Sequence, residues 1–276
     1  MNLLERMTTH YLEILPLVHL PRTAASVFTY SSEKHVQIGS VILTKFNGRR
    51  IRGIVIGSKK KKPSYTVKPI LKTITSGPYF STAELSWIKS LSKFYVTQPS
   101  EIARLFITNK IPHKTLDACV RKKFTHSNIR QKTTYLTIES YSKDLSKLQK
   151  EISKTISSNA QALLLFPTNE QLQDAKRIIT KIFPKEKIVT LHSGLTSKEH
   201  SNAFQSIALK EVSICIGLRH AIFAPFANLE LIIQYDHANN SYKQWDLHPK
   251  YSVGEALALR EKYLPAKYKL YSHAPS

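Results

Sequence analysis

The chain has 276 residues, of which 42% are hydrophobic, so it can bury one large core or two ordinary ones. Its formal net charge of +22 favours polyanionic partners, with nucleic acid first and an acidic membrane surface second. Its two cysteines, Cys119 and Cys215, are too few and too far apart for a disulfide framework or a Cys-x-x-Cys zinc site. Glu5, His10 and Glu13 interrupt any signal-peptide run, and no stretch reaches the roughly 18 apolar residues of a membrane span, so we expect a cytoplasmic protein.

The positive charge is concentrated towards the start of the chain. Residues 1–110 carry 17 Lys and Arg against 5 Glu and no Asp, whereas residues 161–276 carry 14 Lys and Arg against 10 acidic residues. A charge that served solubility alone would be spread more evenly. We therefore expect the first part of the chain to contact the polyanion.

The first 106 residues predict a small, strongly curled β-sheet followed by two helices. Stretches rich in β-branched and aromatic residues favour five strands, at 11–18, 26–32, 40–46, 50–58 and 65–74. Strands at this spacing are typical of a small barrel or a curled sheet. Asn47-Gly48 is the strongest hairpin signal, because both residues tolerate positive φ. Ser81 or Thr82 can cap a first helix, and Pro99 can start a second.

The rest of the chain divides into a linker and an α/β lobe. Residues 107–143 are basic and poorly periodic, so we interpret them as a linker with one strand at 133–138. Beyond 143, strands are expected at 161–167, 187–193, 212–217, 229–236 and 267–272, and helices at 143–156, 169–183, 197–209 and 253–264. This alternation predicts a parallel, doubly wound sheet. The expected domains are 1–106, the linker 107–143, and 144–276.

An α/β lobe of this kind suggests nucleotide binding. The positions of the glycines test this hypothesis. A phosphate loop needs a pattern such as G-x-x-x-x-G-K-[ST] or G-x-G-x-x-G, and none of the eight glycines stands in either. Asp236 follows an expected strand where a Mg²⁺-binding acid would stand, but no second carboxylate adjoins it, and its neighbour His237 points to the other face. We expect no catalytic residue, no cofactor and no metal, with ATP and Mg²⁺ only if the enzyme alternative given below holds.

The basic front of the chain can contact phosphates and bases. Its candidate phosphate contacts are Arg49, Arg50, Arg52, Lys59, Lys60, Lys61 and Lys62. Arg50 and Arg52 are expected on one face of their strand. Phe28, Tyr30, Phe46 and Tyr65 occur near these charges and can either stack on unpaired bases or fill the core of the sheet.

Two long regions resemble the primosomal protein N′ (PriA) family of bacterial replication-restart helicases. "LPLVHLPRTAASVFTYSS" and "VQIGSVILTKFNGRRIRGIVIG" look like the family's N-terminal domain, which binds the 3′ end of the nascent leading strand at a stalled fork. "LHSGLTSKEH" and "CIGLRHAIFAPFANLELIIQYDHANNSYKQ" are similar to its helicase motifs. The resemblance implies a truncated, degenerate member: a small β-barrel-like front domain, then a RecA-like (P-loop-type) lobe without its phosphate loop.

Positions that match the family's motifs imply site residues. Phe28, Thr29 and Tyr30 match its Phe-Asp-Tyr, which lines the pocket for the 3′ end, and Gly48 and Lys68 match its pocket glycine and lysine. Because Thr29 replaces the acid, specific capture of a 3′-hydroxyl is not expected from that position.

The helicase part departs further from the family. Its Asp-Glu-Glu-His is replaced by the sequence Tyr-Asp-His-Ala at 235–238, and its Gly-Thr-Arg-Ser by Gly-Leu-Arg-His at 217–220, so Asp236 and Arg219 are interpreted as vestigial. The phosphate-loop strand before the helix at 143–156, the winged-helix insertion, the second motor lobe and the cysteine-rich zinc region are expected to be missing.

The resemblance implies a protein that binds forked or single-stranded DNA in replication restart, with its helicase ATPase lost. The back lobe would be a scaffold that docks replication or primosome proteins, and the protein would be associated with the bacterial nucleoid. Two alternatives stay open. One is an active ATP-dependent 3′–5′ DNA helicase completed by a partner chain, and the other is a basic protein that binds RNA or the ribosome.

Overall fold

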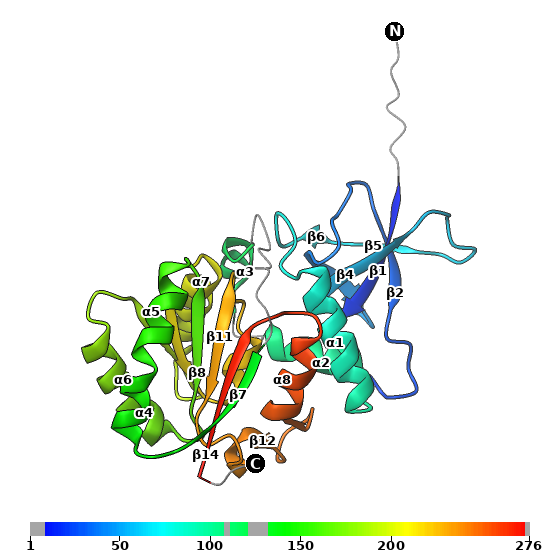
Figure 1. Cartoon of the computed structure of the whole chain (residues 1–276). Coiled ribbons are helices and arrows are strands. Elements are labelled where there is room, and N and C mark those ends of the chain that lie inside the picture. The colour runs from blue at the N-terminus through cyan, green and yellow to red at the C-terminus, as the bar shows by residue number, and fades with distance from the viewer. Residues whose placement is uncertain (1–8, 108–110, 121–131, 274–276) are drawn as a thin grey trace.

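The front part of the molecule is a six-stranded, strongly curled sheet. The computed structural model of the chain describes residues 9–107, 111–120 and 132–273. The front sheet has the strand order β5-β2-β1-β4-β3-β6 and lies on the right in Figure 1. Its strands are β1 (His10–Pro16), β2 (Phe28–Ser32), β3 (Val41–Phe46), β4 (Arg49–Lys59), β5 (Lys68–Pro69) and β6 (Lys72–Thr73).

The structure has two short strands in the front sheet where the sequence predicted one. The sequence predicted a single strand at 65–74, but β5 pairs with β2 at one edge of the sheet and β6 pairs with β3 at the other. The backbone N–H of Ile70 still donates to the Ser31 carbonyl of β2 at 2.9 Å, and that of Leu71 donates to the Leu43 carbonyl of β3 at 2.8 Å, so the chain crosses between the two edges at these residues.

The β3–β4 hairpin turns where the sequence predicted. Asn47 and Gly48 have φ angles of 46° and 78°, and they place Phe46 opposite Arg49. Two-residue hairpin turns of this kind need positive φ at both positions, which Asn and Gly adopt at little cost. The hairpin prediction is therefore confirmed.

A bulge curls the front sheet. The pairing of β1 with β4 shifts register between Glu13 and Ile14, which skips Ile56 of β4. A skipped residue of this kind increases the local twist of a strand pair. The inside of the curl is filled by a small core of Leu12, Ile14, Tyr30, Val36, Ile42 and Val55.

Three helices follow the front strands. α1 (Thr82–Phe94) begins with a capping box between Ser81 and Glu84, and α2 (Pro99–Phe106) begins at a proline, both as predicted. α3 (His113–Ala118) was not predicted. Its stretch of sequence is short and polar, and Leu116 is its one buried residue, so it carries almost no periodic apolar signal.

The back part is a six-stranded parallel sheet in the order β7-β14-β11-β8-β10-β9. Its strands are β7 (Lys132–Thr137), β8 (Gln161–Leu165), β9 (Ile188–Leu191), β10 (Ile214–Gly217), β11 (Leu229–Gln234) and β14 (Lys267–Ser272). Every residue of β8 and β10 is buried, as the continuous apolar runs of central parallel strands require. β12 (Lys243–Gln244) and β13 (Tyr251–Ser252) form a separate two-stranded ribbon.

Helices cover both faces of the back sheet, so the prediction of a doubly wound α/β lobe is confirmed. One face packs against α4 (Tyr141–Lys147), α5 (Gln149–Ser157) and α6 (Asn169–Ile182). The other packs against α7 (Ser197–Ala208), α8 (Val253–Glu261) and the 3-10 helix η1 (Arg219–Phe223), and a second 3-10 helix, η2 (Asn240–Tyr242), follows β11. The structure has two helices, α4 and α5, where a single helix was expected at 143–156, and they meet at Leu148. Within the described ranges, no helix is long and apolar enough to cross a membrane.

The strand expected at 133–138 is β7, and it belongs to the back sheet. It pairs with β14 along its whole length, from Lys132 opposite Lys267 to Thr137 opposite Ser272, and forms an edge of the back sheet. A strand therefore precedes α4, as expected, and it is part of the back sheet although its residues were interpreted as linker. Its burial alternates between exposed and half-buried, which is typical of an edge strand and gives none of the apolar run that marks a central one.

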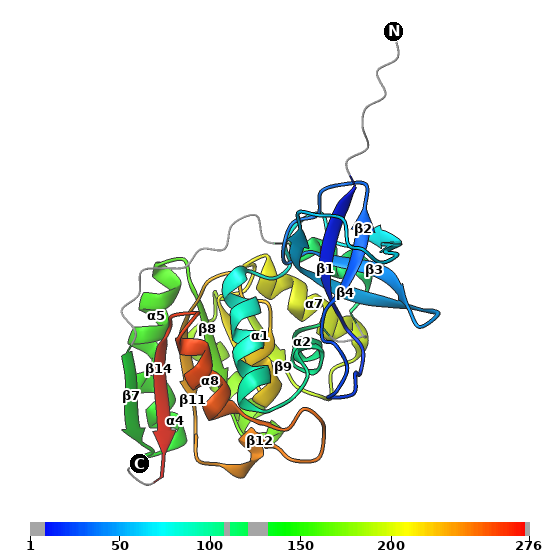
Figure 2. The same ribbon diagram turned by 90° about the vertical axis from the view of Figure 1, so that its right-hand side faces the viewer.

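The front helices join the two sheets into one core. α1 and α8 lie side by side over one face of the back sheet, as Figures 1 and 2 show. The indole Nε1–H of Trp87 donates to the carbonyl of Ala256 at 3.1 Å, and the Tyr95 hydroxyl donates to the Glu255 carboxylate at 2.9 Å. These bonds hold the front sheet at a set position relative to the back sheet.

Candidate nucleic-acid interface

The outer face of the front sheet brings polar residues of three strands together. Because Leu12 and Ile14 point into the curl, Glu13 between them points outward. Its neighbours across the ladder are Thr29 of β2 and Gly57 of β4. The outer face therefore joins residues that are up to 44 positions apart in the chain.

Tyr65 lies over this outer face at the end of the lysine-rich loop. Its hydroxyl donates to Thr29 Oγ1 at 2.9 Å and accepts from Lys59 Nζ at 3.4 Å. The Lys59 ammonium also lies 5.9 Å from the centre of the Tyr65 ring, within the range of a cation–π contact. The ring is 53% exposed, so it is held at its hydroxyl end while most of its surface stays accessible.

Exposed lysines surround this arrangement. Lys60, Lys61 and Lys62 follow β4 and are all exposed, and Lys68 is exposed on β5, opposite Tyr30 of β2. The loop borders an open pocket of about 400 Å³ whose lining includes Tyr11, Ser31, Lys62 and Tyr65. The predicted phosphate contacts of this loop thus lie beside an accessible aromatic ring.

The aromatic residues of the expected 3′-end pocket lie on the other side of the sheet. Tyr30 is 5% exposed in the small core, and its hydroxyl donates to the Lys45 carbonyl at 3.1 Å. Burial raises the pKa of that hydroxyl, so it stays protonated as a donor. Phe28 packs edge to face on Phe46 with ring centroids 4.9 Å apart, and both rings are half-buried. For Tyr30, burial favours the core over base stacking; DNA contact by Phe28, Tyr30 and Phe46 stays a prediction.

The three arginines of β4 differ in their exposure to solvent. Arg49 and Arg50 are exposed beside the turn at Gly48. Arg52 is half-buried and its guanidinium donates to the carbonyl of Ile111 at 2.7 Å, and burial lowers its pKa. Arg49 and Arg50 are therefore accessible to a phosphate, whereas Arg52 holds the segment before α3 against the front sheet.

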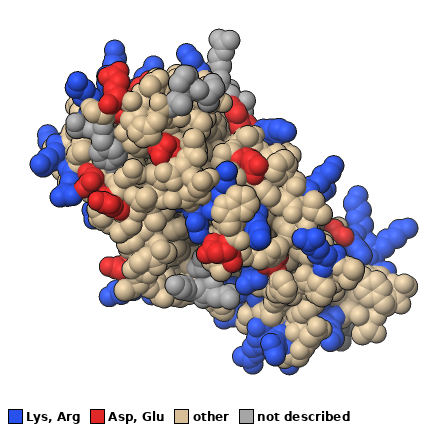
Figure 3. Space-filling model, turned by 90° about the horizontal axis from the view of Figure 1, so that it is seen from below, with Lys and Arg blue, Asp and Glu red and all other residues tan. Residues whose placement is uncertain are grey.

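The charged side chains are unevenly distributed over the surface of the molecule. Figure 3 shows Lys and Arg gathered at the right-hand end of the molecule, which the front sheet forms, with few acidic side chains among them. Over the back part, basic and acidic side chains are mixed. The excess of positive charge predicted for the first part of the chain is thus displayed on one end of the molecule.

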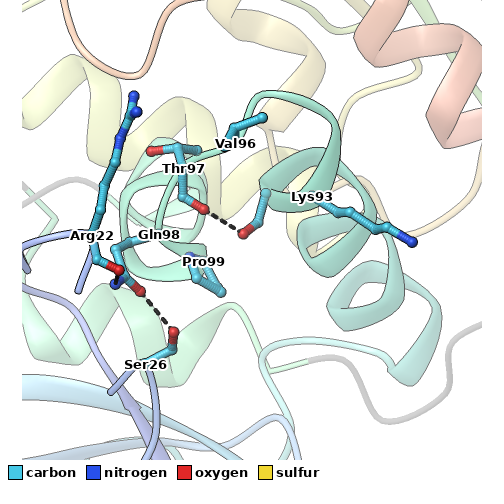
Figure 4. Close-up of a pocket in the computed structure, with 8 residues that line it drawn as sticks. Arg22, Ser26, Lys93, Val96, Thr97, Gln98 and Pro99 are labelled. Carbon is cyan, nitrogen blue, oxygen red and sulfur yellow. Dashed lines mark hydrogen bonds between the residues drawn. The ribbon is translucent and has the colours of Figure 1, made fainter. Parts of the chain in front are cut away.

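A second pocket lies beside the turn between α1 and α2 and has a volume of about 370 Å³ (Figure 4). Arg22 and Lys93 line it but extend in different directions. The buried Gln98 amide donates to three backbone carbonyls of residues 21–24 and accepts a hydrogen bond from Ser26. These bonds fasten the loop before β2 to the front helices, so we interpret this pocket as a structural joint.

At the carboxyl end of the back sheet, Asp236 is tied into a turn. Its φ is 50°, and its carboxylate accepts a hydrogen bond from Asn239 Nδ2 at 2.8 Å. Arg219 donates to the Ser241 carbonyl at 3.4 Å and lies 3.7 Å from the Asp246 carboxylate. In the part of the chain that the structure describes, no group of three or more His, Cys, Asp or Glu side chains is arranged to hold a metal ion.

The turn from β7 into α4 does not fit a nucleotide. Asp144, 1% exposed, accepts hydrogen bonds from the backbone N–H of Glu139 at 3.2 Å and the hydroxyl of Tyr235 at 3.3 Å. Burial, together with the charge of Asp144, raises the pKa of Tyr235, which therefore stays a protonated donor. A triphosphate needs backbone N–H groups of a glycine-rich turn and a nearby cation. Here the turn presents carboxylates, and Lys147 is paired with Glu139.

Comparison with known proteins shows relatives of one kind. A family model described as the PriA 3′ DNA-binding domain matches residues 17–108. The replication restart protein PriA of Rickettsia prowazekii is 24% identical over 269 residues, which cover 90% of this chain and 41% of that protein. PriA of Helicobacter pylori strain 26695 is 23% identical over 263 residues, with the same coverage of both chains, and PriA of Bacillus subtilis is 29% identical over 127 residues.

The chain belongs to the PriA family. The family model falls on the front part, and the relatives extend through the back sheet. This PriA-family chain spans 41% of the length of the Rickettsia prowazekii relative, and its match covers 15% of the Bacillus subtilis one. A solved structure of Mss116p DEAD-box helicase domain 2 bound to an RNA duplex covers 52% of this chain and 54% of that chain at 16% identity and a TM-score of 0.38.

One residue of the outer face, Glu13, was absent from the predicted DNA contacts. Glu13 could have been placed there from the alternation in "HYLEILP", in which Tyr11 and Glu13 take the polar positions. Tyr65 was predicted either to stack on unpaired bases or to fill the core of the sheet. Its position over Thr29 depends on how the loop closes across the sheet, which no sequence period reports.

Proposed function

We propose that this PriA-family protein binds forked or single-stranded DNA during replication restart through the outer face of its front sheet, and that its back lobe is a scaffold without ATPase activity. The match to a 3′ DNA-binding domain and the excess of basic residues at this end support the first part. The observation that carries it is the Tyr65 ring, held by Thr29 and Lys59 among exposed lysines.

The arrangement suits an unpaired strand. Stacking of a base on an aromatic side chain contributes about 1–3 kcal/mol and tolerates any sequence. The hydroxyl contacts orient the Tyr65 ring before DNA arrives, so little side-chain freedom is lost on binding. Lys60–Lys62 and the exposed Arg49 and Arg50 can then neutralise backbone phosphates on either side.

Equilibrium binding to a fork with a single-stranded arm, compared with blunt duplex, tests the DNA-binding part. We expect Tyr65→Ala to weaken fork binding about tenfold while leaving duplex binding nearly unchanged, because duplex bases are already stacked. Replacing Lys60, Lys61 and Lys62 by Ala should weaken binding to both the fork and the duplex. It should also reduce, by about two, the steepness with which the logarithm of the affinity falls with the logarithm of the salt concentration. The matched control replaces Lys176, Lys181 and Lys185, which are exposed on the back part. If both triple variants lose the same affinity, the binding is general charge attraction and the outer face is not the site.

The scaffold part rests on the crevice at the carboxyl ends of the back strands. In open α/β sheets this crevice receives nucleotides. Here Tyr235 and Asp144 close it with a buried hydrogen bond, and Glu139 adds a second carboxylate that would repel phosphates. We expect no ATP hydrolysis with or without fork DNA. DNA-stimulated hydrolysis that disappears in Asp236→Ala would contradict this part and favour the helicase alternative.

A further inference from the structure

A basic groove lies on the back part of the molecule. β7 and β14 form one edge of the back sheet, as Figure 2 shows, and a groove of about 500 Å³ lies between them and α5. Lys132 and Lys267 are the first residues of their strands, so the groove lies at the amino end of the sheet, away from the crevice at Asp144 and Tyr235. Its lining includes five lysines and one acid: Lys132, Lys150, Lys154, Lys267, Lys269 and Glu151.

The floor of the groove is polar where the face of a doubly wound sheet is ordinarily apolar. Lys132 and Thr134 of β7 are in register with Lys267 and Lys269 of β14, on the sheet face that carries the buried Tyr271 further along. Lys132 is exposed, and Lys267 and Lys269 are half-buried. Charges placed beside a core lose part of their hydration, so an anion that pairs with them would be bound favourably.

The helix α5 supplies the facing wall of the groove. Lys150 and Lys154 are four residues apart, so they lie on one face of the helix, and both are exposed. Glu151 forms an ion pair with Lys269, whose side chain is 17% exposed. In the ranges that the structure describes, no ion pair reaches the other four lysines of the lining. Four ammonium groups therefore share one hollow without an acid to balance them.

The charge and shape of the groove define its ligand. A single phosphate group carries at most about two negative charges near pH 7, which balances only half of the four ammonium groups. Two or three adjacent phosphates carry more charge in the same small volume and can contact both the floor and the wall. A DNA duplex presents its phosphates on a convex surface, so it would contact Lys150 and Lys154 at the rim and leave the half-buried Lys267 on the floor untouched.

We propose that this groove binds a small ligand with two or three adjacent phosphate groups, and that Lys150, Lys154 and Lys267 are its main contacts. This inference goes beyond the DNA-binding function and does not depend on it. The groove shares no lining residue with the pocket beside Tyr65 on the front sheet.

Isothermal titration calorimetry with three inorganic anions tests the proposal. The anions are tripolyphosphate, pyrophosphate and phosphate, each titrated into the full chain at low salt. Tripolyphosphate should bind at least about tenfold more tightly than phosphate, because it forms more charge-assisted hydrogen bonds with the lysines. Equal affinities for the three anions would contradict a site built for adjacent phosphates.

Variants of the groove locate the binding site. Lys267→Gln should weaken tripolyphosphate binding about tenfold, and Lys150→Gln combined with Lys154→Gln should weaken it at least as much. Glu151→Gln should strengthen it, because the change removes a repelling carboxylate and releases Lys269. Thermal melting of each variant checks that it is folded. Unchanged affinity in folded Lys267→Gln would overturn the proposal.

Two controls separate the groove from general charge attraction. Lys176→Gln combined with Lys181→Gln removes two exposed charges from α6 and should leave the tripolyphosphate affinity unchanged. Replacing Lys60, Lys61 and Lys62 of the front sheet by Ala should also leave it unchanged. A loss in either control as large as the loss in the groove variants would show that the anion binds without a defined site, and the proposal would fall.

DNA titrations distinguish a free phosphate ligand from a nucleic-acid backbone. Lys267→Gln should bind blunt duplex and single-stranded oligonucleotides as tightly as the wild-type protein does. If its affinity for either falls by the same factor as its affinity for tripolyphosphate, the groove is a DNA contact and the assignment to a small ligand is wrong. Failure of the front-sheet function would instead appear as DNA binding that is insensitive to Lys60–Lys62, with tripolyphosphate binding intact.

Discussion

The rings of Trp87 and Phe223 stack with their centroids 5.7 Å apart, and this contact joins a helix of the front part to the 3-10 helix that follows β10. Phe106 of α2 packs edge to face on both rings. Trp87 is 1% exposed, and its indole N–H reaches the Ala256 carbonyl on α8. The surface that we propose binds DNA is thus carried on helices that share one core with the back sheet.

This shared core predicts how the chain unfolds. Urea unfolding followed by tryptophan fluorescence and by circular dichroism should give one coincident transition, because the front and back parts cannot separate without exposing Trp87. Trp87→Phe keeps a ring but leaves a buried carbonyl without its donor, at a cost of about 1–3 kcal/mol. Trp87→Ala also opens a cavity and should cost about 3–5 kcal/mol. Two separated transitions in the wild-type protein would contradict a single core.

Arg50 and Arg52 form a matched pair on one strand face. Arg50→Ala should weaken DNA binding about threefold to tenfold with little change in the free energy of unfolding, since Arg50 is exposed. Arg52→Ala should lower the free energy of unfolding by about 1–3 kcal/mol, because it removes the donor to the Ile111 carbonyl. DNA titration and denaturant unfolding of both variants check these separate roles. A loss of stability in Arg50→Ala and a loss of DNA binding alone in Arg52→Ala would contradict them.

The Tyr235 hydroxyl should be needed for stability. Tyr235→Phe removes a donor to the buried Asp144 carboxylate and should cost about 1–3 kcal/mol in denaturant unfolding. Tyr271 is the control, because it stacks on Tyr235 at 5.7 Å and its hydroxyl has no hydrogen-bond partner among the residues described. Tyr271→Phe should cost less than Tyr235→Phe. Equal costs would show that the hydrogen bond to Asp144 contributes nothing.

Stability should fall in mildly acidic solution because of His220. Burial, followed by the charges of His200, Arg219 and His192, lowers the pKa of His220 to about 4, from an ordinary value of 6.5. Between these two values the unfolded chain binds a proton that the folded protein does not. The contribution of His220 to the free energy of unfolding should therefore be constant above about pH 7 and decrease as the pH falls from 6.5 towards 4, by up to about 3 kcal/mol. Urea unfolding of wild type and His220→Gln at pH 7.5 and 5 checks this, and an unchanged pH dependence in the variant would exclude His220.

Much of this protein could be predicted from local patterns in its sequence. The hairpin at Asn47 and Gly48, the capping box at Ser81 and the proline start of α2 depend on residues a few positions apart, so propensity and side-chain chemistry decide them. The parallel back sheet follows from apolar runs that alternate with amphipathic helices. The basic character of the front follows from counting charges.

Only the tertiary structure decided which residues meet. β7 carries too little apolar pattern to be assigned to the back sheet, and its place depends on pairing with β14, more than a hundred residues later. Tyr30 and Thr29 are adjacent in sequence, yet strand alternation buries one and places the other beneath Tyr65. Glu13 lies between Thr29 and Gly57 only because β1 pairs with both β2 and β4. Such neighbours are set by strand register and loop closure, which are properties of the folded chain and leave no local period in the sequence.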